Sequence, residues 1–488
     1  MPHPPDIVDH ESALAYLFGR IDYERADKIP YRSRGLSMER MRQLAARLGD
    51  PQQRFPIVHV AGTKGKGSTS AMIAAVLTAA GYRTGLYTSP HVECVEERMQ
   101  IDGRRCGGDE FIELIRQLRP TVDALDGEYA TRRDGKPGPT YFEITTAAAL
   151  LHFVRGQVEI AVLEVGLGGR LDSTNICRPE VAVITSISFD HMRQLGNTLA
   201  AIAGEKAGII KAGVPVVTGV TEPEPLDVIQ QTASRQGCDC FVAGRDFHYR
   251  YRGAHAPSAD EAAEGGAFAT WPHGWAELDY WEDTAAARYE LDHLRIGLLG
   301  RHQAANAAVA LATLSRLREQ GWRVDEPAVR QGLARAQMPA RAEIVHQRPT
   351  VIVDAAHNVA SVGALIDVIR ETCPRAATAR RILVFAASQD KDAAAMLRPL
   401  LAEFDVVILT RFENNPRAAE PRRLLHTAQR IAAGDDGISC RLITQESSAA
   451  AWDVARSMAA AEDLICVAGS FFLASELRSV IQQESLGS

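Results

Sequence analysis

The segment AGTKGKGSTS, residues 61–70, constrains the fold of this chain more than any other stretch. It follows the short apolar run PIVHVAG (56–62), which is typical of a buried strand ending in glycine. It precedes SAMIAAVLTAAGY (70–82), whose alanine content and apolar spacing predict a helix. In a strand, glycine-rich loop and helix, backbone N–H groups and the helix N-terminus converge on a phosphate. The segment therefore predicts a phosphate-binding loop in an α/β domain.

The loop departs from the ordinary P-loop. That motif has a glycine six residues before its lysine and Ser or Thr directly after the lysine. Here Val60 occupies the first position, and Gly67 separates Lys66 from Ser68. The alternative interpretation is a tight turn whose lysines face solvent. The buried strand before the loop and the helix after it favour phosphate binding.

The strand and helix pattern continues on both sides of a less regular region. Strands are expected at 84–89, 159–166 and 180–188, and a helix at 143–154, which together predict a parallel sheet covered on both faces. Between about 241 and 292 aromatic, glycine and acidic residues mix without a sustained period, and we expect a β-rich insertion there. Helical texture returns at 301–336, and four short apolar strands then alternate with helices to the end.

The chain is long enough for two domains. Its 488 residues exceed what one core usually serves, since domains have roughly 100 to 200 residues. We place the boundary near Gln337. The prediction is an α/β protein with two doubly wound domains, residues 1–337, including the insertion, and residues 338–488.

Composition excludes several classes of protein. Hydrophobic residues make up 46% and charged residues 24%, as in ordinary globular proteins, and the net charge of -7 gives no overall attraction for nucleic acid or an anionic membrane. The sequence has neither a secretory signal pattern nor an apolar run near the ~20 residues of a spanning helix, so we expect a cytoplasmic protein. Eight scattered cysteines indicate reduced thiols rather than a zinc knuckle or redox pair.

Five motifs resemble one family. They are HVAGTKGKGSTS (59–70), TSPH (88–91), LEVGLGGRLDSTN (163–175), FDH (189–191) and EKAGIIK (205–211). Together they are similar to the folylpolyglutamate synthase and dihydrofolate synthase family of the Mur ligase superfamily, in which the opening loop has this irregular spacing. The resemblance covers nearly the whole chain. It implies a P-loop ATPase-like Mur ligase central domain followed by a Rossmann-like C-terminal Mur ligase domain.

The resemblance also implies a reaction. A ligase of this family transfers the γ-phosphoryl group of ATP to a substrate carboxylate, and the amino group of L-glutamate then displaces phosphate from the acyl phosphate. Such chemistry requires charge neutralisation and alignment more than a protein nucleophile. The implied substrates are folate or dihydropteroate and L-glutamate, and the implied cofactors are ATP and two Mg²⁺ ions, with a monovalent cation as a further candidate. A monomer is expected, with neither nucleic acid nor a membrane as partner.

By the same resemblance, the loop supplies the phosphate contacts, with Lys66 as a catalytic cation. The ATP-binding loop residues are Gly62, Thr63, Lys64, Gly65, Lys66, Gly67, Ser68 and Thr69. Many family members have Asn in place of Lys64, so this chain carries an additional positive charge beside the phosphates.

The resemblance also implies that Ser89 and Glu164 hold one Mg²⁺ ion and that His191 helps to hold a second. Mg²⁺ prefers oxygen ligands. From the residues alone, His191 would be an orienting or catalytic group, because imidazole is an unusual magnesium ligand. Glu164 would alternatively be a salt-bridged carboxylate at a strand end, since a buried carboxylate needs a partner.

Lys206 matches the position of a carbamylated lysine in the family. Carbamylation would convert this cation into an anion that holds the second Mg²⁺ and takes part in catalysis. The alternative is an unmodified lysine paired with Glu205 or another acid. Glu143 matches a family motif in a supporting role, and an intrahelical or sheet-edge contact explains it equally well.

The remaining ATP contacts are implied for Asn306, Arg341, Asp354 and His357. Arg341 suits a phosphate through bidentate charge-assisted bonds, and Asp354 suits a ribose hydroxyl. Taken alone, His357 would be a histidine satisfied within a loop.

Two other functions compete with folate ligation. Another Mur-type amide ligase would act on a different carboxylate, although the GLGGRLDSTN string argues against it. A nucleotide-dependent switch would hydrolyse ATP without an acyl acceptor. Dependence of ATP turnover on a folate and glutamate together separates folate ligation from both.

Overall fold

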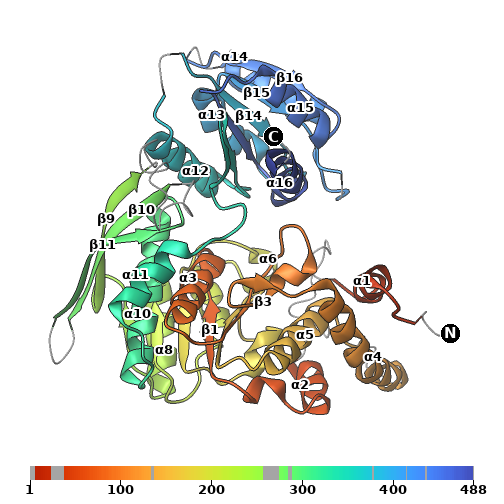
Figure 1. The fold of residues 1–488 in the computed structure, drawn as a ribbon, viewed down its shortest axis with the longest axis vertical. Helices are drawn as coiled ribbons and strands as arrows, with labels where there is room; N and C mark the ends of the chain where they lie inside the picture. Colours follow the sequence, from red (N-terminus) through yellow and green to blue (C-terminus); the bar gives the residue numbers. More distant parts are fainter. Residues whose placement is uncertain are drawn as a thin grey trace. The chain divides into compact units, whose positions relative to one another are not determined.

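The computed structural model describes residues 6–22, 38–132, 137–255, 274–283, 288–375, 378–413, 415–434 and 437–486. Contacts divide the chain into two compact units. The first unit comprises residues 1–249, 280–291 and 305–335, and the second comprises 250–279, 292–304 and 336–488. Each unit is built around its own sheet, drawn in Figure 1 in colours that follow the sequence.

The first unit contains an eight-stranded sheet in the order β4-β3-β2-β5-β1-β6-β7-β8. Strands β2, β5, β1, β6, β7 and β8 pair in parallel, and β3 and β4 extend the β2 edge in antiparallel pairs. The strands are β1 (Ile57–Ala61), β2 (Thr84–Tyr87), β3 (Met99–Ile101), β4 (Arg104–Arg105), β5 (Ile160–Glu164), β6 (Val181–Ile184), β7 (Val216–Thr218) and β8 (Cys240–Val242).

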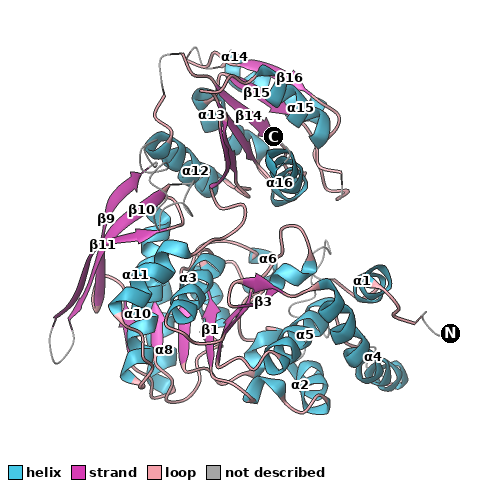
Figure 2. Cartoon of the chain, in the orientation of Figure 1, coloured by secondary structure: helices cyan, strands magenta, loops and turns pink. Residues whose placement is uncertain are grey.

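Helices cover both faces of this sheet, as Figure 2 shows by secondary structure. Helix α3 packs on β1, β2 and β5 and against α11, whereas α5 packs on β2 and β3 and carries α4 as an outer layer. Ala161 and Leu163 of β5 belong to the core that α4 and α5 share, because alternate strand residues face opposite sides. The helices are α1 (His10–Phe18), α2 (Met38–Arg47), α3 (Lys66–Ala79), α4 (Gly108–Thr131), α5 (Tyr141–Arg155), α6 (Met192–Leu195), α7 (Leu199–Ala207), α8 (Pro223–Arg235), α10 (Arg301–Glu319) and α11 (Glu326–Arg335).

A separate three-stranded sheet occupies the region expected to be β-rich. Its strands are β9 (Phe247–His255), β10 (Trp275–Asp283) and β11 (Arg288–Ile296), in the order β11-β10-β9. Paired rings line it, including His248 stacked on Trp281 with centroids 5.5 Å apart. The parts of the expected insertion at 256–273 and 284–287 lie outside the described residues.

The second unit contains a six-stranded sheet in the order β12-β13-β17-β14-β15-β16, parallel except for β12. Its strands are β12 (Glu343–Gln347), β13 (Thr350–Val353), β14 (Arg381–Phe385), β15 (Val406–Leu409), β16 (Arg441–Thr444) and β17 (Leu464–Ala468). Its helices are α12 (Val359–Thr372), α13 (Ala393–Glu403), α14 (Pro421–Ala433), α15 (Ser448–Met458) and α16 (Phe471–Leu486). The α/β prediction with two doubly wound domains is confirmed.

The expected strands of the second domain correspond to β13, β14, β15 and β17, and the sequence prediction missed β12 and β16. Both missed strands lie at sheet edges and are only partly buried. Edge strands carry polar residues on exposed positions, so they lack the continuous apolar run that marks central parallel strands.

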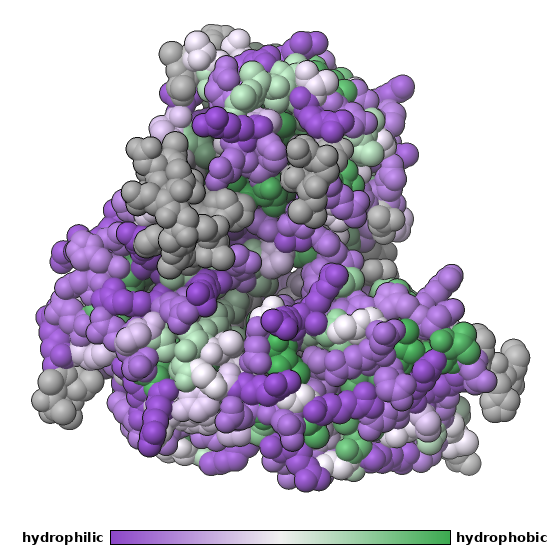
Figure 3. Space-filling view, viewed as in Figure 1, coloured by the Kyte–Doolittle hydropathy of each residue, from purple (hydrophilic) through white to green (hydrophobic). Residues whose placement is uncertain are grey.

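Hydrophilic residues predominate on the face shown in Figure 3, where apolar residues form small patches. Among the described residues, no helix is both long enough and apolar enough to cross a membrane.

Candidate active site

The predicted residues of the first unit follow the carboxyl ends of four neighbouring strands, β2, β5, β1 and β6. The TSPH segment follows β2, Glu164 ends β5, the phosphate loop follows β1, and FDH follows β6. Open parallel sheets bind ligands at this edge. The topology therefore brings the phosphate loop at 61–70 and the FDH motif at 189–191, which are more than a hundred residues apart in sequence, to one edge of one sheet.

The loop after β1 is shaped to surround an anion. Helix α3 begins at Lys66. Its first helical hydrogen bond runs from Thr69 N to Gly65 O, at 2.9 Å. The four preceding amides, of residues 65–68, lack an intrahelical acceptor, so they and the helix dipole favour a negative group. These observations fit the phosphates of a nucleotide.

Glycine is required at two loop positions. Gly62 has φ +154° and a Cβ there would lie 1.9 Å from Thr185 Oγ1. Gly65 has φ +83° and its Cβ would lie 2.2 Å from Asn306 Oδ1. The second contact also locates Asn306, on α10, directly beside the phosphate loop, although 241 positions separate the two residues in sequence.

The β6 end holds the other side of the loop. Thr185 Oγ1 donates to Lys64 O at 2.7 Å, and Thr63 N donates to Ser186 O at 2.7 Å. Thr63 Oγ1 accepts from Ser188 N at 3.1 Å. The sequence prediction missed this clamp, because its residues carry no motif of their own.

Lys66, Glu164 and Ser89 lie together. Lys66 Nζ is 3.9 Å from Glu164 Oε1, and Glu164 Oε2 accepts from Ser89 N at 3.0 Å. Glu164 is buried with 3% exposure, and this burial makes its negative charge dependent on nearby cations. A carboxylate and a hydroxyl-bearing residue on adjacent strand ends match the oxygen ligands that Mg²⁺ prefers. In the alternative interpretation, in which Glu164 forms a salt bridge, Lys66 would be its partner.

Lys206 is buried on α7 with its amine against the phosphate loop. Its Nζ donates to Gly62 O at 2.7 Å, and the residue is 4% exposed. Burial, together with the positive charge of Lys66, lowers the pKa of Lys206 to about 7, and Asp190 and Asp172 partly offset this. Glu205, the alternative partner considered from sequence, instead pairs with Arg170 at 2.8 Å.

His191 lies in the left-handed region, with φ +48°, at the start of the short helix α6. Its side chain is 54% exposed, and its Nε2 is 3.9 Å from Asp190 Oδ1. Asp190, the middle residue of the FDH motif, received no role from the sequence analysis, yet it lies beside His191 and its charge raises the pKa of Lys206.

The LDSTN segment anchors the loop after Glu164 to the helix that carries Lys206. Asn175 Nδ2 donates to Arg170 O and to Gly208 O, each at 3.1 Å, and Asn175 Oδ1 accepts from Lys211 Nζ at 2.6 Å. Arg170 N also donates to Glu205 O at 2.8 Å. The motif of residues 163–175 therefore supplies Glu164 at its start and, through Asn175, connects the following loop to the end of α7.

Glu143 has a structural role. Its carboxylate accepts from Thr140 N at 2.8 Å in the capping box of α5 and pairs with the fully buried Arg40 at 2.6 Å. This favours the local-contact interpretation over a supporting catalytic role.

In the second unit, Asp354 and His357 follow β13. Asp354 Oδ2 accepts from Ala342 N and its Oδ1 accepts from Ala356 N, both at 2.6 Å. Burial raises the pKa of Asp354, and the charge of Arg341 and the two amides oppose that rise. The ring Nδ1 of His357 is 2.9 Å from Ala355 O. Arg341 precedes β12, which pairs antiparallel with β13, so the structure brings Arg341 to the same end of the β12–β13 pair as Asp354 and His357.

Comparison with known families agrees with this architecture. Residues 60–314 match the Mur ligase middle domain, and residues 340–471 match the Mur ligase glutamate ligase domain. These matches define the class as Mur ligase.

Known proteins narrow the class further. The chain is 39% identical to the dihydrofolate synthase/folylpolyglutamate synthase of Bacillus subtilis over 74% of this chain and 77% of that protein. The structure of Escherichia coli FolC in complex with DHPP and ADP is 31% identical, with a TM-score of 0.77, covering 99% of this chain and 100% of that one. Mycobacterium tuberculosis folylpolyglutamate synthase, complexed with ADP and AMPPCP, is 30% identical, with a TM-score of 0.79, covering 97% and 99%. The chain belongs to the folylpolyglutamate synthase and dihydrofolate synthase family of Mur ligases, as its motifs predicted.

Proposed function

We propose that this protein is an ATP-dependent ligase that adds L-glutamate to folates, both as a folylpolyglutamate synthase and as a dihydrofolate synthase acting on dihydropteroate. The observation that carries the proposal is the convergence of Lys66, Glu164 and Ser89 at one sheet edge, beside a glycine loop whose helix begins at Lys66. The Bacillus subtilis relative is named for both activities.

The chemistry follows from the charges at this edge. A carboxylate oxygen of the folate attacks the γ-phosphorus of ATP, ADP leaves, and an acyl phosphate forms. The amine of L-glutamate then attacks the acyl carbon, and inorganic phosphate leaves as the amide forms and the amine loses its proton. Lys66 and the loop amides neutralise the negative charge that builds on the transferred phosphoryl group.

The residues suit two Mg²⁺ ions, which when bound would neutralise the negative charge of the phosphates. Ser89 and Glu164 would hold one ion. His191 and Lys206, the latter as a carbamate, would hold the second, and we also propose His191 as a catalytic group. A monovalent cation is a further candidate cofactor.

Carbamylation of Lys206 is supported by its surroundings. The uncharged amine is the form that attacks CO₂, and a pKa near 7 makes that form abundant at neutral pH. The attack forms an N–C bond and releases one proton, so the buried cation becomes an anion. Mass spectrometry of the intact protein under bicarbonate, with Lys206→Met as the control, tests this assignment.

We also propose that Asn306, Arg341, Asp354 and His357 contact ATP, and that the domains span residues 1–337 and 338–488. The position of Asn306 against Gly65 supports its part in this assignment. The second contact unit, which includes residues 336–488, and the glutamate ligase match at 340–471 support the boundary. We propose a cytoplasmic monomer, which light scattering on the purified full chain would test.

The deciding experiment measures phosphate release with Mg-ATP and L-glutamate, comparing dihydropteroate, tetrahydrofolate and no acceptor, with products identified by mass. Glutamate addition to both acceptors is the expected result. Addition to tetrahydrofolate alone would restrict the protein to polyglutamylation. Addition to neither would point to another Mur-type ligase, and equal phosphate release without acceptor would point to an ATP switch.

A further inference from the structure

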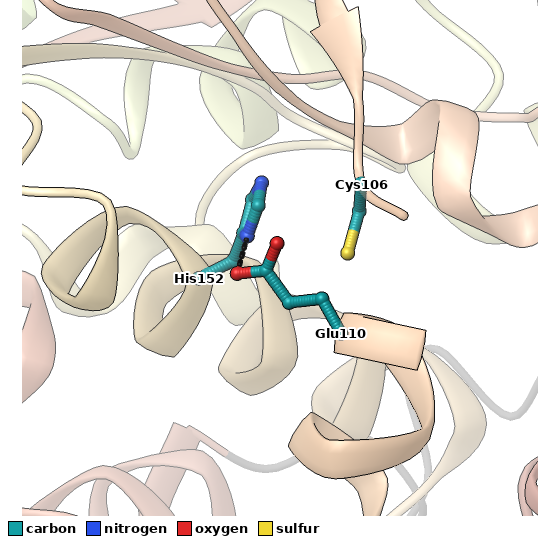
Figure 4. A group of neighbouring side chains, drawn as sticks. All are labelled: Cys106, Glu110 and His152. Atoms are coloured by element: carbon teal, nitrogen blue, oxygen red, sulfur yellow. Dashed lines mark hydrogen bonds and ion pairs between the residues drawn. The ribbon is translucent and has the colours of Figure 1, made fainter. Parts of the chain in front are cut away.

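A second group of potential metal ligands lies in the first unit, apart from the strand ends that form the candidate active site. It consists of Cys106, Glu110 and His152, whose ligand atoms all lie within 4.8 Å of one another. Figure 4 shows the three side chains projecting toward one another from the β4–α4 connection, from α4 and from α5. None of them belongs to the predicted ATP or magnesium residues.

We propose that Cys106, Glu110 and His152 form a binding site for a divalent transition-metal ion of the zinc class. Thiolate sulfur, imidazole nitrogen and carboxylate oxygen are the ligands of Zn²⁺ sites, whereas Mg²⁺ takes oxygen ligands and avoids thiolate. The site would therefore select a different ion from the one proposed for phosphoryl transfer.

Burial and charge favour a cation at this position. Cys106 and His152 are 2% and 4% exposed, while the Glu110 side chain is 39% exposed and leaves a path from solvent. A divalent ion bound by one thiolate, one carboxylate and one neutral imidazole has no net charge, which lowers the cost of burying it. On binding, the metal–sulfur bond replaces the S–H bond and the thiol proton passes to water.

Polar groups around the three ligands support the same interpretation. The carboxylates of Glu110 and Glu96 both act electrostatically on the Cys106 thiol, so the cluster carries negative charge. The Oε2 atom of Glu96 and the Nε2 atom of His152 are buried and have no hydrogen-bond partner among the described residues. Glu96 is itself 5% exposed, and its other carboxylate oxygen is hydrogen-bonded to His10. Glu96 or a water would complete a four-coordinate site.

The ion would connect two layers of the fold. In its absence, His152 Nδ1 and Glu110 Oε1 form a 2.7 Å hydrogen bond between α5 and α4. A metal would replace that bond and add the connection before α4, at Cys106. Bound metal is thus expected to stabilise the α4–α5 layer without touching the phosphate loop.

The test uses tag-free full-length protein, treated with chelator and titrated with Co²⁺, whose thiolate complexes absorb in the near ultraviolet. We expect a sulfur-to-cobalt charge-transfer band that Zn²⁺ abolishes and a large excess of Mg²⁺ leaves intact. Cys106→Ser should remove the band, while Cys177→Ser, which changes another buried thiol, should retain it. Glu110→Gln and His152→Asn should each weaken Co²⁺ binding at least about 10-fold.

A band that persists in Cys106→Ser, or equal Co²⁺ binding by wild type and Glu110→Gln, would overturn the proposal and leave the cluster as an interhelical hydrogen bond beside a core thiol. Glu110→Gln is the decisive variant if Cys106→Ser fails to fold, because Glu110 is partly exposed. Failure of folate ligation would not affect this outcome, since the readout is spectroscopic and needs no ATP.

Discussion

The predicted site residues lie at the edges of two sheets, and they form different kinds of contact at each edge. In the first unit, charged side chains from separate strands lie against one another, with Lys66 facing Glu164 and the amine of Lys206 on the phosphate loop. In the second unit, Asp354 uses both carboxylate oxygens on neighbouring backbone amides, and His357 bonds to the backbone of its own loop. At the first edge, charged side chains lie close to one another. At the second edge, the predicted site residues Asp354 and His357 form hydrogen bonds with the local backbone.

The contacts of a residue in a family motif indicate whether changing that residue should affect function or stability first. A residue whose polar atoms face other charged side chains should lose function when it is changed. A residue whose atoms are already satisfied by buried amides should lose stability first, because unpaired buried donors are costly. Substitutions at the first edge should therefore lower activity most, and substitutions at the second edge should lower stability most.

The largest effect is expected for Lys66→Ala. Removing this cation should reduce the rate of ligation on the order of 1,000-fold, because Lys66 is the lysine at the start of α3 that lies 3.9 Å from Glu164. The fold should stay intact, and the free energy of unfolding should fall by only about 1 kcal/mol, because buried Glu164 loses a cation that lies 3.9 Å away. Phosphate release and urea unfolding measure both, with Arg47→Ala, a surface pair with Glu128, as the control. Full ligation in Lys66→Ala would remove this edge from phosphoryl transfer.

Glu164→Gln should have the next largest effect. Losing the negative charge should raise the Mg²⁺ concentration for half-maximal ligation roughly 10- to 100-fold and lower the maximal rate with it. Glu113→Gln, an exposed glutamate on α4, is the matched control. An unchanged Mg²⁺ titration would assign Glu164 to the salt bridge with Lys66 alone.

Asp354→Asn tests the other edge. The amide group of asparagine presents one acceptor where the carboxylate presents two, so one of the amides of Ala342 and Ala356 loses its partner. The free energy of unfolding should fall by about 1–3 kcal/mol. Urea unfolding beside Asp453→Asn, an exposed control, measures this loss. Weaker ATP binding with unchanged stability would instead make Asp354 a nucleotide contact first and contradict the contrast drawn between the edges.

The sequence predicted those parts of the molecule that a local pattern encodes. Central strands such as β5 and β17 are short fully buried runs, and the glycine loop is defined by its neighbours on both sides. The partly exposed strands β12 and β16 lack such a run. The clamp from Thr185 and the bonds of Asn175 to Arg170 and Gly208 join segments distant in sequence, so no spacing rule indicates them.

For the same reason, only part of the candidate site could be predicted from the sequence. Lys66, Glu164 and Ser89 were predicted from motifs, and the structure places them together. Asp190 and the Cys106, Glu110 and His152 cluster were not predicted, because their proximity arises only when the loops and helices pack. The roles of His191, Lys206 and the ATP contacts stay predictions.

Lys206 gives the smallest and most specific test, because its charge depends on folding. Its pKa is lowered from the ordinary lysine value of 10.5 to about 7 in the folded protein. Between these values the unfolded lysine holds a proton that the folded one has lost, so the free energy of unfolding should rise with pH across this window. In CO₂-free buffer, the gain from pH 7 to 8 should be about 1 kcal/mol. Lys206→Met should lack this gain when both proteins are unfolded in urea at each pH. If the free energy of unfolding rose equally with pH in wild type and Lys206→Met, then burial and the charge of Lys66 would not lower the pKa of Lys206. Charged groups at the first edge would in that case interact less strongly than their contacts indicate.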